Sequence, residues 1–322
     1  MMKETLKIFS ILAFLILFPI SILSQQKASV LAVISDVSGE VFLKKAKKTE
    51  SLKAVFGMQL MKGDQVITQK KSKVELLFND GNLISLGSNS SITISGKKTD
   101  EKVKNIGAVL AGSFSDLALR SDSKGEVGVL IDLRSTETDQ TIILISPCNT
   151  MIKSNQPVLS WESTKPAEEY VVRVYNDNGL IWEKKTSETK IKITETATAL
   201  HFGESYFWNV EGIDMIDSFR SLNQKFTIYS QDKILELESM EEQIKDFFRD
   251  DLNSSSFHSV LGAFYAKKGM LEEAIKEFEI VKEANPESSL PHEILGKLYS
   301  DVGKKDLAIM ELQRALMLEK EK

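Results

Sequence analysis

Two of the three histidines in this chain are spaced in a way that invites a metal-site interpretation. His258 and His292 occupy the same position of a sequence repeat described below, at an offset of 34 residues (292 minus 258). Helices packed side by side lie about 10 Å apart, whereas a zinc ion needs its ligands at about 2 Å. We therefore expect both histidines to serve packing rather than to share a metal ion. His201 has no such partner nearby in the sequence.

Other candidates for chemistry are a single cysteine and two pairs of adjacent acids. Cys148 has no second cysteine with which to form an internal disulfide, so we expect a small buried apolar side chain, with intermolecular pairing as the alternative. The pairs Glu241-Glu242 and Glu272-Glu273 are expected on solvated helix surfaces. The sequence contains no Ser-His-Asp arrangement, phosphate-binding glycine loop or HExxH motif. It therefore predicts a protein that is not an enzyme and holds neither cofactor nor metal; an envelope enzyme or its carbohydrate-binding part is the alternative.

A repeat lies near the end of the chain, where the spacing of apolar residues changes from that of strands to that of helices. The motif Leu-Gly-x-x-Tyr occurs twice with an offset of 34 residues, and residues downstream of it recur with the same offset. This period and pattern resemble tetratricopeptide repeats, each of which is a pair of antiparallel helices. The small residues would let the two helices approach closely, and the large ones would fill the space beside them. The matched positions are Leu261 and Leu295, Gly262 and Gly296, Tyr265 and Tyr299, Gly269 and Gly303, Ala274 and Ala308, and Phe278 and Leu312.

The resemblance implies two tetratricopeptide repeats over 255–322, preceded by a linker or capping helix over 231–254. Repeats of this kind act as scaffolds that hold a peptide or a helix in a concave groove lined by the first helix of each repeat. A protein or peptide partner is therefore expected, with modest affinity because the lining is mixed and weakly charged. By position, the expected partner-binding residues are Ser256, Ser259, Ala263, Ala266, Lys267, Leu290, Glu293, Lys297, Ser300 and Asp301.

The final helix of the second repeat carries apolar side chains that no later helix in this sequence covers. Leu316 and Leu318 point about 200° apart on a helix, so one neighbouring helix cannot bury both. Exposed apolar strips often mark contact sites. We expect this helix either to dock on another chain, as a homo-oligomer or on the partner, or to fold back on the preceding β domain.

A β-hairpin is predicted in the first part of the chain. Val74 and Leu76 belong to an alternating strand, which is followed by the three turn formers of residues 79–81. A three-residue loop there, with its glycine in the left-handed conformation, places Leu76 opposite Ile84 and Val74 opposite Leu86. One face of the hairpin is then apolar and the other polar, whereas a two-residue loop gives a poorer match.

The spacing of turn and strand residues around this hairpin resembles the core of FecR-type domains, which are all-β modules of bacterial cell envelopes. The matching pattern is Gly63-Asp64, Val66-x-Thr68, Val74-x-Leu76-x-Phe78-x-Asp80-Gly81, Ile84-x-Leu86 and Ser91-x-x-Ile94. The resemblance implies a β domain over 28–140 without catalytic residues. Its best-known members relay an outside signal to a sigma factor, so a signal receptor or regulator is one alternative function.

Small basic clusters in the same region suggest another alternative, which is binding of an anionic envelope polymer such as a glycan. Solvated hairpin tips explain the same lysines more simply, because lysine is common there and blunts sheet edges. The clusters comprise Lys44, Lys45, Lys47, Lys48, Lys53, Lys70, Lys71, Lys73, Lys97 and Lys98.

Short alternating strands separated by turns continue over 141–230. The motif Pro157-x-x-x-Trp161 and the run at 200–210 resemble bacterial immunoglobulin-like and fibronectin type III modules. This resemblance implies a β-sandwich. Trp161 and Trp208 are expected to fill the space between its two sheets.

The first 24 residues have the organisation of a secretory signal peptide. Lys3 and Lys7 precede an apolar run at 8–23, and the small residue Ser24 is followed by polar sequence. An uncleaved anchor in the inner membrane is the alternative. The net charge of −5 gives no reason to expect a nucleic-acid partner.

These features together predict a multidomain protein with an all-β FecR-like domain, a β-sandwich and an all-α tetratricopeptide tail. A chain of 322 residues is long enough for two or three packed domains. We expect an exported, non-enzymatic scaffold or adaptor of a bacterial cell envelope, periplasmic or associated with the outer envelope.

Overall fold

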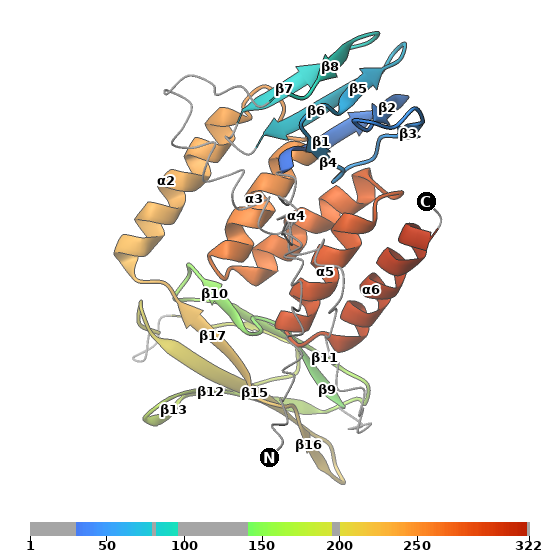
Figure 1. Ribbon diagram of the computed structural model, residues 1–322. Helices are drawn as coiled ribbons and strands as arrows, with labels where there is room; N and C mark the ends of the chain where they lie inside the picture. Colours follow the sequence, from blue (N-terminus) through green and yellow to red (C-terminus); the bar gives the residue numbers. More distant parts are fainter. Residues whose placement is uncertain (1–29, 79–81, 96–140, 195–199, 321–322) are drawn as a thin grey trace, which may run out of the picture.

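The structure, a computed structural model, describes residues 30–78, 82–95, 141–194 and 200–320. Two β units lie at opposite ends of the molecule, with helices between them (Figure 1). The expected order along the chain, strands first and helices last, is confirmed. The predicted signal peptide at 1–24, the hairpin tip at 79–81 and the expected domain boundary near 140 lie outside the described residues.

The first β unit is a sandwich of two four-stranded sheets, ordered β4-β1-β6-β7 and β3-β2-β5-β8. Ile34 and Leu76 from one sheet meet Leu43 and Val66 from the other in one apolar core. The strands are β1 (Val30–Ser38), β2 (Val41–Lys44), β3 (Ser51–Lys53), β4 (Gln59–Met61), β5 (Gln65–Thr68), β6 (Lys73–Phe78), β7 (Leu83–Leu86) and β8 (Ser91–Thr93).

The hairpin of β6 and β7 has the register predicted for a three-residue loop. Val74 pairs with Leu86 and Leu76 with Ile84, and the Phe78 amide donates to the Asn82 carbonyl oxygen at 2.8 Å. The two-residue alternative is therefore wrong. The conformation expected for the glycine of the loop lies outside the described residues.

Strands β1 and β6 bury both of their faces. Ile34 and Leu76 point into the sandwich, whereas Val33 and Leu77, one residue along, belong to the apolar core that contains the helices. This follows from the two-residue period of a strand. The second face also carries Glu75, which is buried although the sequence predicts a polar face there. The helices supply the cover that the strand sequence alone does not reveal.

The second β unit combines a six-stranded sheet with a three-stranded one. Trp208 is buried and its Nε1 donates to the Pro147 carbonyl oxygen at 2.8 Å. Trp161 packs edge to face on Tyr170, with ring centroids 5.5 Å apart. Both tryptophans therefore fill the core as expected. The strands are β9 (Ile142–Ser146), β10 (Thr150–Ile152), β11 (Val158–Ser163), β12 (Glu169–Asn176), β13 (Gly179–Thr186), β14 (Lys190–Lys192), β15 (Ser205–Ile213), β16 (Ser218–Arg220) and β17 (Gln224–Ile228).

Five described helices follow, and the last four form two consecutive hairpins. A Cβ at Gly262 would lie 2.9 Å from the Phe278 ring, and a Cβ at Gly296 would lie 2.6 Å from Leu312 Cγ. The two hairpins thus close through equivalent contacts. No helix in the described part of the chain is long and apolar enough to cross a membrane. The helices are α2 (Gln231–Phe247), α3 (Ser255–Lys267), α4 (Leu271–Ala284), α5 (Ser289–Asp301) and α6 (Lys305–Lys320).

One continuous apolar core joins the helices to both β units. Val33 and Phe56 of the first β unit and Trp208 of the second belong to the same core as Phe257 and Leu295 of the helices. The sequence pattern divides the chain at 140, 230 and 254, but these segments share buried surface in the folded chain. The helices are therefore a packed middle layer (Figure 1).

Candidate partner-binding surface

The residues expected to line the groove lie on α3 and α5, and the structure divides them into a buried and an accessible group. The buried group lies toward the start of each helix, while the others are half-buried or exposed toward the end. The buried residues are Ser256, Ser259, Ala263 and Leu290; Ala266, Glu293 and Lys297 are half-buried, and Lys267, Ser300 and Asp301 are exposed.

The first β unit covers the start of the expected groove. Ser256 Oγ donates to Glu75 Oε2 at 2.6 Å and lies 2.8 Å from Ser35 Oγ. At Gly57, whose φ of +81° suits glycine, an added Cβ would lie 2.5 Å from Leu290 Cδ2. Partner binding at Ser256 and Leu290 would therefore require the β unit to move away, which the sequence could not reveal.

Charged groups surround this contact between α3 and the first β unit. Lys73 Nζ lies 2.9 Å from Glu75 Oε1 and 3.9 Å from Asp251 Oδ2. The hydrogen bond to Glu75 raises the pKa of Lys73. Burial, and then the charge of Glu75, raises the pKa of Asp36. We call Ser35, Asp36, Lys73, Glu75 and Ser256 the polar seam; together they form a contact between β1, β6 and α3 that responds to protonation.

The opposite ends of the helices are fixed to the second β unit. The Glu272 carboxylate, at the start of α4, accepts from Ser146 Oγ at 2.6 Å and from the Cys148 amide at 2.9 Å. The Met151 amide donates to the Gly269 carbonyl oxygen at 2.8 Å. Cys148 is buried as expected, and burial raises the pKa of its thiol to about 12. Because the thiolate is the reactive form, this thiol is poorly suited to nucleophilic chemistry.

The two histidines make the same contact in each repeat. His258 Nδ1 lies 2.6 Å from Glu277 Oε2, and His292 Nδ1 lies 2.5 Å from Glu311 Oε2. Each pair bridges the two helices of one hairpin. The sequence identified the repeated histidines but not their carboxylate partners, which recur with the same offset and were the available signal.

Two of the acids expected to be solvated are instead engaged in contacts. Glu241 is buried and accepts from Lys153 Nζ at 2.9 Å, and Glu272 is bound by the second β unit. Glu273 Oε2 is buried without a hydrogen-bond partner among the described residues, and burial raises the pKa of Glu273. The described residues contain no group of three or more His, Cys, Asp or Glu side chains that could hold a metal ion.

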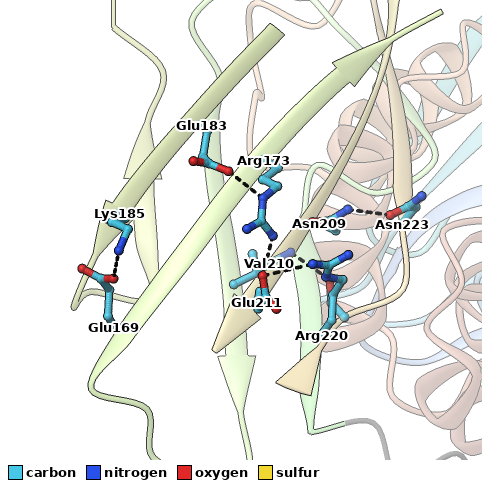
Figure 2. Close-up of polar contacts among 10 residues, drawn as sticks. Glu169, Arg173, Glu183, Lys185, Asn209, Val210, Glu211, Arg220 and Asn223 are labelled. Carbon is cyan, nitrogen blue, oxygen red and sulfur yellow. Dashed lines mark hydrogen bonds and ion pairs between the residues drawn. The ribbon is translucent and has the colours of Figure 1, made fainter. Parts of the chain in front are cut away.

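The outer face of the large sheet of the second β unit carries a ladder of ion pairs (Figure 2). Arg173 contacts Glu183 at 2.7 Å and Glu211 at 2.6 Å, and Arg220 contacts Glu211 at 3.0 Å. The hydrogen bond from Arg173 is the main cause that lowers the pKa of Glu211. Cross-strand pairs of this kind stabilise a sheet, and their charges already satisfy one another.

The lysines that suggested polymer binding take part in several ion pairs. Lys45 Nζ lies 3.0 Å from Asp64 Oδ2, and Lys53 Nζ lies 2.7 Å from Glu287 Oε2. Lys73 belongs to the polar seam. The cluster at 97–98 lies outside the described residues.

Comparison with known proteins does not identify a family. No family model and no curated protein matches this chain. A cell surface anchoring domain shares 18% identity at a TM-score of 0.20, covering 24% of this chain and 93% of its own. The dimeric latent PorU of Porphyromonas gingivalis shares 11% identity at a TM-score of 0.23, covering 61% of this chain and 16% of its own. Similarities this low carry no argument about the fold or function of this chain.

Proposed function

We propose that this chain is an exported, non-enzymatic scaffold of a bacterial cell envelope, built from a FecR-like domain, an immunoglobulin-like sandwich and tetratricopeptide repeats. The observation that carries the proposal is the repeated helical hairpin. Gly262 meets Phe278 as Gly296 meets Leu312, and each hairpin holds an equivalent His–Glu pair. Equivalent contacts at equivalent repeat positions are what stacked repeats require, and such stacks present surfaces for protein partners. The signal-like sequence at 1–24 supports export.

The partner surface is the accessible part of the groove, toward the ends of α3 and α5. Lys267 is exposed there, and Lys297 is half-buried and lies 3.2 Å from Glu293 Oε1. Ser300 and Asp301 extend the same surface. Its charges have both signs, so it suits a polar peptide or helix, bound with modest affinity.

Reversing two charges on this surface tests the proposal. The double change Lys267→Glu and Lys297→Glu should weaken capture of the partner by on the order of tenfold, because the complementary charges would then repel. The matched control is Lys276→Glu with Lys305→Glu, on the second helices of the two repeats. Capture would be measured by pull-down from envelope extracts, with circular dichroism as the check on folding.

The two variants separate the outcomes. If both capture the same partner as well as the unchanged chain does, the groove is not the binding surface. If both lose it equally, the effect comes from net charge alone, and the proposed surface is again wrong.

A further inference from the structure

The turn between β15 and β16 presents two apolar side chains to solvent. Met215 is 88% exposed and Ile216 is 95% exposed, the highest values among the exposed large apolar residues of the described chain. Asp214 Oδ1 accepts from the amides of Ile216 and Asp217, both at 2.8 Å. The Asp214 amide donates to the Asp217 carbonyl oxygen at 3.1 Å. These bonds hold the turn in one shape, so the two side chains are presented without a further cost of ordering the loop. We call residues 214–217 the hairpin tip.

Acidic side chains border the hairpin tip on both sides. Asp214 and Asp217 flank the two apolar residues, and hydrogen bonds from backbone amides lower the pKa of Asp214. The tip therefore presents an apolar centre between carboxylates. Anionic lipid surfaces attract basic segments and not acidic ones. The chemistry that fits the tip is an apolar surface with a cationic neighbour.

The outer face of α6 has this chemistry. Met310 is 63% exposed and Met317 is 56% exposed, and Arg314 is exposed between them. These three residues are spaced by four and three positions, so they share one side of the helix. Ala308 and Ala315 are buried where α6 packs along α5. Methionine side chains adapt readily to the shape of a partner. We call Met310, Arg314 and Met317 the α6 face.

We propose that the hairpin tip of one copy docks on the α6 face of a second copy. Met215 and Ile216 then pack on the two methionines, and Asp217 approaches Arg314. The tip and the α6 face belong to different parts of one molecule: the β16 hairpin projects at one end, whereas α6 runs along the helical layer (Figure 1). Ile216 is almost fully exposed, so it packs on no surface of its own copy.

A contact between two different surfaces leaves one tip and one face unused in every pair. Such head-to-tail contacts extend into a ring or an open chain of copies. Two apolar residues bury little area, well below the interfaces of about 1,200 Å² or more that hold stable complexes. The assembly is therefore weak and depends on protein concentration, which suits an array formed where the protein is concentrated.

Complementation between two variants is the test. Sedimentation or light scattering of the chain up to ~1 mM should show a mass that rises with concentration. Ile216→Glu and Met317→Glu should each remove this rise. An equimolar mixture of the two variants should form a complex of one copy of each and nothing larger, since only one intact tip and one intact face remain. Leu316→Glu is the matched control on α6, because Leu316 points about 100° away from Met317.

A charge exchange supplies a second readout that does not depend on apolar packing. Asp217→Arg should weaken association, and adding Arg314→Asp to the same chain should restore it. Thermal unfolding checks that each variant is folded.

Several results would overturn the proposal. They are a chain that stays monomeric over the whole range, an Ile216→Glu variant that associates normally, or a mixture that does not form the heterodimer. Association that persists in Ile216→Glu but fails in Met317→Glu would mean that α6 pairs with α6. A chain that does not self-associate but binds vesicles of phosphatidylcholine and phosphatidylglycerol through Ile216 would assign the tip to a membrane.

Discussion

Ser256 shows how the same residue type serves a binding surface in one context and a domain contact in another. Its hydroxyl lies 2.8 Å from Ser35 Oγ and 2.6 Å from Glu75 Oε2, in a buried environment. Removing one partner from such a set leaves buried polar atoms unsatisfied, which usually costs more than the hydrogen bond itself contributes. The polar seam is thus held as a group, and its protonation affects how the first β unit sits on α3.

Asp36 gives the polar seam a defined pH dependence. Burial and the charge of Glu75 raise its pKa, so the folded chain binds this proton more readily than the unfolded chain. The stability that the residue contributes therefore falls as pH rises from the ordinary aspartate pKa of about 3.9 through the raised value, and stays low above it.

Replacing Asp36 with asparagine should remove this dependence. Asp36→Asn should unfold at a higher urea concentration than the unchanged chain at pH 7, and the difference should vanish below about pH 3.9. Asp177→Asn, on an exposed turn, makes the same chemical change and should show no such trend. A constant difference across this pH range, or a less stable Asp36→Asn at pH 7, would contradict the assignment.

At the scale of elements, two close approaches define the helical hairpins. Gly262 and Gly296 each face a large side chain of the next helix, at distances where no Cβ fits without a shift. Glycine within a helix is normally unfavourable by about 1 kcal/mol relative to alanine. Its presence at both positions is therefore explained by packing between helices and not by helix formation.

Alanine at either glycine should destabilise the chain. Gly262→Ala and Gly296→Ala would force Phe278 or Leu312 to move, and overpacking of this kind costs about 1–3 kcal/mol. This cost exceeds the gain of helix propensity for most of that range. Gly87→Ala is the control, because no atom lies within 4 Å of its added Cβ. Urea unfolding would measure all three, and equal or increased stability of both helix variants would show that the hairpins are more loosely packed than described.

At the scale of the whole molecule, the helices and both β units are expected to unfold together. The apolar core is continuous from Phe56 through Phe257 and Leu295 to Trp208. Removing the helical repeats would expose Val33, Phe56 and Leu77 to water, so the β units are not independent of the tail. Domains that share a core of this kind lose their separate stabilities.

The positions of the tryptophans make this cooperativity measurable. All three tryptophans, Trp161, Trp182 and Trp208, lie in the second β unit, whereas the helical signal in circular dichroism comes from α2–α6. Urea unfolding followed by tryptophan fluorescence and by circular dichroism at 222 nm should give coincident transitions. Two separated midpoints would show that the second β unit folds independently of the helices.

The sequence by itself determined the features that depend on local spacing. Alternation and turn formers predicted the β6–β7 register, the periodicity at 261–312 predicted paired helices with close approaches at the glycines, and large aromatic residues predicted the core of the second β unit. These follow because neighbouring residues along an element share its geometry.

Tertiary structure alone decided which predicted surfaces stay exposed. Glu75 was expected on a polar face and Ser256 in a groove, yet each buries the other. Leu316 and Leu318 do fall on different sides of α6, at 57% and 6% exposure, but the sequence could not say which would be covered. Residues such as Ser35 and Ser256 are separated by more than two hundred positions, and no local period records a contact of that range. It is the packing of one element against another that removes the water, and with it decides what each side chain can do.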